Sequence, residues 1–266
     1  MMMIRAAVLL ILVTASLFAA EPVNKPLVIR PLKDWKASRE DVKKVLYSAA
    51  GELWTLFPGR ELKPIEVEPK GGPITLYKRG PNGEIQIKLD TGGTLWAQYA
   101  FQFAHEMGHV LCSYDEDDHK NKWFEESICE LASLFVLRRM SKSWESQPPY
   151  PNWKNYAPHL KSYADERMKT AQLPAGQTLA QWYADNAPVL ASNATDRERN
   201  NVVATALLPL FEAQPERWEA VTWLNAEKLT PLHTFKDYLF AWRRNAPEKH
   251  RPFITMIAKE LGVELD

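Results

Sequence analysis

The chain has 266 residues, enough for one large domain or two small ones with a substantial hydrophobic core. Lys plus Arg and Asp plus Glu number 33 each, so the formal net charge at pH 7 is zero. This balance forces no strongly basic surface, and nucleic acid is therefore not expected as a partner.

The first 20 residues have the pattern of a secretory signal peptide. Arg5 supplies a positive charge, residues 6–20 form an almost uninterrupted apolar run, and Ala19 and Ala20 offer a small-residue cleavage site. We therefore expect a secreted or periplasmic protein, the alternative being a retained N-terminal anchor helix. No later stretch approaches the ~20 apolar residues that cross a bilayer, so no membrane span is expected after signal removal.

The following segment carries one helix pattern and several strand patterns. Ser38 and Asp41 resemble a capping box, and apolar residues at helical spacing predict a helix from about residue 39 to 56. Short strands are expected at 65–67, 74–78 and 85–89, with another at 27–30. Asn82-Gly83 predicts a hairpin, so we expect a small, largely antiparallel sheet.

From Thr94 onward the pattern is helical almost throughout. A helix capped by Thr94 is expected to run to about Cys112, and a second from about residue 122 to 140. After a proline-rich boundary near residue 148, further helices are expected at 158–170, 179–186, 196–213, 215–224, 235–244 and 250–261. The predicted class is α+β, mostly α, with a core at 21–145 and a helical C-terminal subdomain at 146–266.

The segment from His105 to His109 reads His-Glu-Met-Gly-His. Residues four apart on a helix share a face, so both imidazoles could bind one Zn²⁺. Glu106 is rotated about 100° around the helix axis from His105. From there it could reach a water at the metal without being a ligand. Gly108 costs the helix about 1 kcal/mol relative to Ala, which suggests that another group approaches the backbone closely there.

A catalytic zinc normally has three protein ligands and one open position. Glu126 and Glu130 are also four residues apart, and their like charges are unfavourable on a helix unless a cation lies nearby. We expect Glu126 to be the third ligand and Glu130 to accept a hydrogen bond from a ligand histidine. The alternative is that both carboxylates belong to a solvated acidic face.

The His-Glu-x-x-His motif, followed after a short loop by Trp-Phe-Glu-Glu at residues 123–126, resembles the gluzincin metallopeptidases, a peptidase MA-like group that includes thermolysin. The resemblance implies a zincin-like catalytic core within residues 21–145 and one zinc ion held by His105, His109 and Glu126. It also implies that Glu130 supports the first histidine and that a strand ending near Leu89 borders the substrate cleft.

The activity implied by this resemblance is zinc-dependent hydrolysis of a peptide or protein substrate, with Glu106 as general base. Ser127 departs from the glycine common among relatives, and the usual Tyr or His that stabilises the oxyanion has no clear equivalent. Candidates for that role are Tyr156, His159, Tyr163, Tyr183, Arg197, Arg199, Asn200 and Asn201. The rival functions are a catalytically inactive, zinc-stabilised binding module and an accidental motif.

Cys112 and Cys129 lie three residues after His109 and Glu126, respectively. In an exported protein such a pair could form a disulfide, and we expect one here. An antiparallel arrangement of the two helices would oppose it by carrying the cysteines in opposite axial directions. Two buried free thiols are the alternative, and two thiolate ligands would overfill a catalytic zinc site.

Overall fold

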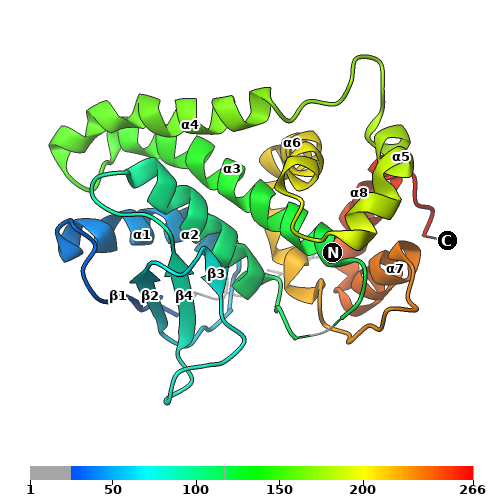
Figure 1. Cartoon of the computed structure of the whole chain (residues 1–266), viewed down its shortest axis with the longest axis horizontal. Helices are drawn as coiled ribbons and strands as arrows, with labels where there is room; N and C mark the ends of the chain where they lie inside the picture. Colours follow the sequence, from blue (N-terminus) through cyan, green and yellow to red (C-terminus); the bar gives the residue numbers. More distant parts are fainter. Residues whose placement is uncertain (1–24, 117, 266) are drawn as a thin grey trace, which may run out of the picture.

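The computed structural model describes residues 25–116 and 118–265. The predicted signal peptide at 1–20, and with it the predicted localisation, lies outside the described residues. Within them the α+β, mostly α class is confirmed, because a four-stranded sheet is followed by helices to the end of the chain (Figure 1). The strands are β1 Ile29–Pro31, β2 Ile65–Pro69, β3 Ile74–Thr75 and β4 Ile85–Leu89.

The α-helices of the described part are α1 Arg39–Trp54, α2 Trp96–Leu111, α3 Lys122–Ser146, α4 Ala157–Lys169, α5 Leu179–Ser192, α6 Arg197–Ala213, α7 Phe235–Asn245 and α8 Arg251–Glu260. Three 3₁₀ segments join them: η1 Pro151–Tyr156, η2 Pro215–Trp223 and η3 Glu248–His250. The positions predicted from periodicity are close to these bounds. The segment expected as a helix at 215–224 is a 3₁₀ run. Helix α3 continues to Ser146 instead of ending near residue 140, and α5 continues to Ser192 instead of residue 186. The strand expected at 74–78 is shorter and ends at Thr75.

The sheet is mixed, so the prediction of a largely antiparallel sheet is wrong. Its strand order is β1-β2-β4-β3; β1 pairs with β2 and β2 with β4 in parallel, and only β3 and β4 are antiparallel. The β3–β4 hairpin forms as expected, but β4 inserts between β2 and β3. Helix α1 provides the crossover that the parallel β1–β2 pair requires.

The sheet packs against α1 and α2 through its alternating apolar residues. In β2 and β4 every second residue is buried, which matches the two-residue period of a strand with one covered face. Helix α1 contacts β1 and α2, while α2 contacts β3 and β4. Strand β3 is the short edge strand, and it places Thr75 against the middle of α2.

Helix α3 lies antiparallel to α2 and crosses the centre of the molecule (Figure 1). The Ser133 hydroxyl donates to the Phe101 carbonyl at 2.8 Å, while farther along α2 His109 faces Glu125. The close approach predicted at Gly108 is confirmed, because a Cβ there would lie 2.9 Å from Cys129 Sγ and 3.1 Å from Cys129 Cα. The other side of α3 packs against α4 and α6.

Several helix ends follow the expected capping chemistry. Thr178 and Gln181 form a capping box at the start of α5, Asp196 caps α6, and Gly262 adopts a positive φ of 71° after α8. The cap predicted at Thr94 is wrong, because Leu95, with no side-chain hydrogen bond, precedes α2.

Arg60 closes the C-terminal end of α2. Its guanidinium donates to the carbonyl oxygens of Leu111 at 2.6 Å and Val110 at 3.0 Å, and to the Thr222 hydroxyl at 3.0 Å. A cation is favourable at the last carbonyls of a helix, where the dipole is negative. The same side chain therefore joins α2 to η2, from the distant C-terminal part of the chain.

Among the described residues, no helix combines the length and apolarity that a bilayer crossing requires.

We expect Gly108→Ala to destabilise the protein by about 1–3 kcal/mol, because the added methyl group overpacks the α2–α3 contact. This cost outweighs the roughly 1 kcal/mol by which Ala improves helix propensity. Gly51→Ala in α1 is the control, since nothing lies within 4 Å of its added Cβ. Urea unfolding should show lower stability for Gly108→Ala and unchanged or higher stability for Gly51→Ala. Equal stabilisation by both changes would contradict the close contact.

Candidate metal site

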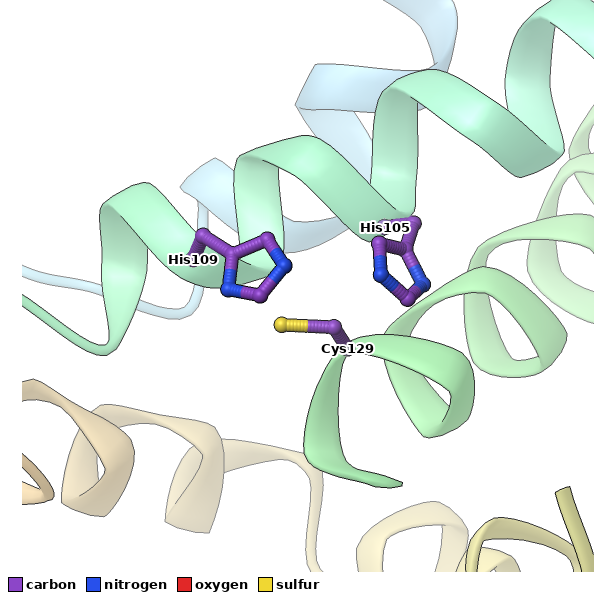
Figure 2. A group of neighbouring side chains, drawn as sticks. All are labelled: His105, His109 and Cys129. Atoms are coloured by element: carbon purple, nitrogen blue, oxygen red, sulfur yellow. The ribbon is translucent and has the colours of Figure 1, made fainter. Parts of the chain in front are cut away.

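The two motif histidines project from one face of α2 toward α3 (Figure 2). His105 Nε2 lies 3.1 Å from Glu126 Oε2, and His109 Nε2 lies 3.7 Å from Glu126 Oε1. The Glu126 carboxylate therefore faces the Nε2 atoms of both rings. The structure thus brings together the three residues expected as metal ligands.

The opposite ring nitrogens face two other carboxylates of α3. His109 Nδ1 lies 2.6 Å from Glu125 Oε1, and His105 Nδ1 lies 3.6 Å from Glu130 Oε1. The second distance is long for a hydrogen bond, so Glu130 is an ion-pair neighbour of His105 in this structure. Glu130 is 3% exposed, and its Oε2 has no hydrogen-bond partner among the described residues. Each imidazole thus has a carboxylate on Nδ1 that leaves Nε2 directed at Glu126.

Glu125 is held in turn by the C-terminal part of the chain. Its Oε2 accepts a hydrogen bond from Asn225 Nδ2 at 2.8 Å, and Asn225 Oδ1 accepts one from the Tyr238 hydroxyl at 2.7 Å. Glu125 is 8% exposed, so both of its oxygens have partners in a nearly dry environment. This chain of hydrogen bonds fixes the carboxylate that orients His109.

Glu106 is 2% exposed and lies against the edge strand. The Thr75 hydroxyl is 2.8 Å from Glu106 Oε2 and 3.0 Å from the Glu106 carbonyl oxygen. The single hydroxyl proton serves these two acceptors, and the contact restricts the rotamer of the carboxylate. β3 therefore positions the residue expected as general base.

Both histidines, Glu106, Glu125, Glu126 and Thr75 line one cavity of about 260 Å³. One wall comes from the β3 segment and Tyr114, whose hydroxyl donates to the Leu76 carbonyl at 2.8 Å and whose ring stacks on Tyr77. Thr195 and Arg197, just before and at the start of α6, also line the cavity. The full lining is Pro73, Ile74, Thr75, Tyr77, His105, Glu106, His109, Tyr114, Lys122, Glu125, Glu126, Thr195 and Arg197.

Of the eight candidates for an oxyanion donor, Arg197 alone lines this cavity. The others have structural partners. The Tyr156 hydroxyl accepts from the Ala97 amide, Tyr163 accepts from Arg167, and Arg199 pairs with Asp196. The remaining members of the set pack or hydrogen-bond elsewhere: His159 against Tyr156, Tyr183 against Trp123, Asn200 on the Ala194 carbonyl and Asn201 on the Arg167 carbonyl.

Cys129 forms a second group with the histidines. Ligand atoms of His105, His109 and Cys129 all lie within 4.8 Å of one another, a group that could hold a metal ion (Figure 2). The Cys129 thiol is fully buried, and burial together with a hydrogen bond involving Cys112 raises its pKa well above the usual value. In the absence of a metal ion the neutral thiol is therefore favoured over the thiolate.

Both cysteines are free thiols in this structure, so the predicted disulfide is absent from it. Cys129 packs against Gly108, which lies one turn before Cys112 on α2. The two cysteines remain close enough to interact, as the pKa of Cys129 indicates.

The carboxylates dominate the protonation of the two imidazoles. Burial by itself would lower the pKa of His109, but the hydrogen bond and charge of Glu125 outweigh it and raise the pKa to about 10. Burial likewise opposes the charged form of His105, yet Glu126 and Glu130 raise its pKa above the usual value. Burial would raise the pKa of Glu126, whereas the histidines and Arg197 lower it.

Comparison of the chain with models of protein families, with curated proteins and with solved structures gives no match.

Sequence reasoning missed Thr75, Glu125 and Asn225 as contributors to the site. The role of Glu125 could have been predicted, because Glu125 directly precedes Glu126 and an antiparallel pair of helices brings it opposite His109. Thr75 falls on the covered side of an expected strand, but nothing in the sequence shows which helix residue it meets. Asn225 lies 100 positions from Glu125 and carries no local signal.

We expect Asn225→Ala to lower the affinity for a bound metal ion by about 10- to 100-fold, the usual range for loss of a group that orients a ligand. The substitution removes both the donor to Glu125 and the acceptor of the Tyr238 hydroxyl. Competition with a fluorescent zinc chelator measures the affinity. Asn245→Ala is the control, because the Asn245 amide contacts Glu227 away from the site. Equal affinities of the two variants would contradict a positioning role for Asn225.

Proposed function

We propose that the protein is a zinc-dependent peptidase in which His105, His109 and Glu126 bind one zinc ion and Glu106 is the general base. The observation that carries the proposal is the orientation of the two imidazoles. Each ring has its Nδ1 beside a carboxylate and its Nε2 directed at Glu126, with Glu106 in the same cavity. Purely structural histidines do not need this arrangement.

The residues present fit a zinc ion. Two imidazole nitrogens and one carboxylate are a ligand set of catalytic zinc sites, which keep a further position open. A cation would also offset the charge of the buried Glu130, whose Oε2 has no hydrogen-bond partner within the described residues. The donor set His105, His109 and Cys129 is the alternative. We favour Glu126 because its carboxylate lines the cavity and faces the Nε2 atoms of both rings, whereas Cys129 packs against Gly108 and is not part of the cavity lining.

Bound zinc would supply a Lewis acid that polarises a carbonyl group and lowers the pKa of water. The chain supplies the proton transfers. Glu106, fixed by Thr75, would take a proton from the attacking water and deliver it to the leaving amine. The peptide would lie in the cavity that the β3 segment and the start of α6 both line. Arg197 is the cationic side chain at the start of α6.

The rival proposal is a zinc-stabilised binding module without turnover. It draws support from the cavity lining, which contains none of the Tyr and His residues considered as oxyanion donors from the later helices. Glu106 speaks against it, because a structural metal site has no use for a buried carboxylate held beside the ligands by a separate hydroxyl.

The ligand set can be decided by metal content. We expect purified protein to carry about one zinc per chain by elemental analysis, and His109→Ala and Glu126→Gln to lose most of it, because each removes one of three ligands. Cys129→Ser should retain the metal. Loss of zinc from Cys129→Ser with retention in Glu126→Gln would instead assign the thiol as the third ligand.

The base can be tested separately from the ligands. We expect Glu106→Gln to retain zinc and to lose hydrolysis of a peptide library by at least ~10²-fold, since the amide cannot accept the proton. Cleavage is followed by mass spectrometry of the products. The control is Glu145→Gln, an exposed carboxylate at the far end of α3. Activity of Glu106→Gln equal to that of the control would refute the mechanism, and zinc binding without cleavage by any form would favour the binding module.

A further inference from the structure

A second cavity of about 680 Å³ opens beside the first turn of α6, between α4 and α5. The charged residues that line it have an excess of positive charge: they are Arg167, Arg197 and Arg199, with Glu198 as the single carboxylate. The chain as a whole has no net charge, so this local excess of guanidinium groups is a property of the site and not of the composition.

Arg197 lines both this cavity and the one that contains the motif histidines. Its side chain is exposed and makes no hydrogen bond or ion pair with any other residue in the described ranges. Arg197 therefore lies at the junction between the two cavities with its donors available.

Arg167 lines the second cavity in a fixed orientation. Its guanidinium carbon lies 4.0 Å from the centre of the Phe101 ring and 4.8 Å from that of Tyr163, and the same group donates to the Tyr163 hydroxyl at 2.8 Å. No carboxylate within the described residues pairs with it. Stacking on aromatic faces limits the rotamers of an arginine while leaving its edge free to bind an anion.

Arg199, the third arginine, has a structural role. It pairs with Asp196, the residue that caps α6, and donates to Asn186 at 3.0 Å. The positive charges left for a ligand are therefore those of Arg167 and Arg197. Guanidinium groups bind carboxylates through paired, charge-assisted hydrogen bonds.

We propose that this second cavity binds a carboxylate of the peptide substrate through Arg197 and Arg167, so that the protein prefers peptides that present a carboxylate to these two arginines. The inference rests on the proposed peptidase function and adds a substrate class to it. The carboxylate is either the C-terminus of the peptide or the side chain of Asp or Glu. Different changes to the peptide remove these two carboxylates. Amidation removes the first, and replacement by Asn or Gln removes the second.

The test uses zinc-loaded Glu106→Gln full-length protein, so that binding is measured without cleavage. A neutral octapeptide, acetylated and amidated at its ends, is compared by calorimetry with versions that carry either a free C-terminus or one Glu at successive positions. We expect at least one acidic version to bind about 10-fold or more tightly, the range of a charge-assisted hydrogen bond. Adding Arg197→Gln or Arg167→Gln should abolish that preference, and Arg197→Lys should restore part of it.

Lys169→Gln is the control, because it removes an exposed charge from α4 that does not line the cavity. Equal affinity for neutral and acidic peptides, or a preference that survives both arginine substitutions, would overturn the inference. Glu106-dependent cleavage by the wild type without acid preference would leave the peptidase function standing and remove only the substrate class. Arginine-dependent binding of peptides with a carboxylate, without any cleavage, would leave the carboxylate-binding cavity standing and remove the peptidase function.

Discussion

The contact between Gly108 and Cys129 sets the distance between α2 and α3, and the candidate site depends on that distance. With no side chain at residue 108, the two antiparallel backbones approach closely enough for both imidazoles to reach the carboxylates of the facing helix. The lower helix propensity of glycine is thus offset by interhelical contacts. The edge strand and the start of α6 also line the cavity at this helix pair.

The site concentrates negative charge around two imidazoles. The carboxylates of Glu106, Glu125, Glu126 and Glu130 all act on the histidines, and without a metal they favour protonated rings despite burial. His109 therefore stabilises the metal-free protein fully below its ordinary pKa of 6.5, and this contribution is lost as pH rises through about 10. A metal ion that binds both rings must displace their protons, so rising pH strengthens its binding.

The sequence indicated which residues the structure brings together around the histidines more closely than it indicated the sheet. Helical spacing gave His105 and His109 a shared face, because helical periodicity is local and a four-residue repeat defines one face. The resemblance to gluzincins pointed to Glu126. The pairing of β4 between β2 and β3 depends on long-range contacts that no local pattern encodes. For the same reason the sequence did not indicate the contributions of Asn225 and Arg197. Both residues reach the site from segments more than 60 residues after the first turn of α3.

The hydrogen bond between Asn225 and Glu125 has a consequence for the order in which the parts of the chain fold. The two motif helices are close in sequence and can pair early, whereas Asn225, Tyr238 and the Thr222 contact of Arg60 belong to the last quarter of the chain. A metal ion captured by the helix pair alone would lack the support of His109 by a fixed carboxylate. If the site binds a metal ion as proposed, full affinity would arise only after η2 and α7 have docked, and tight metal retention would then mark a chain whose folding is complete.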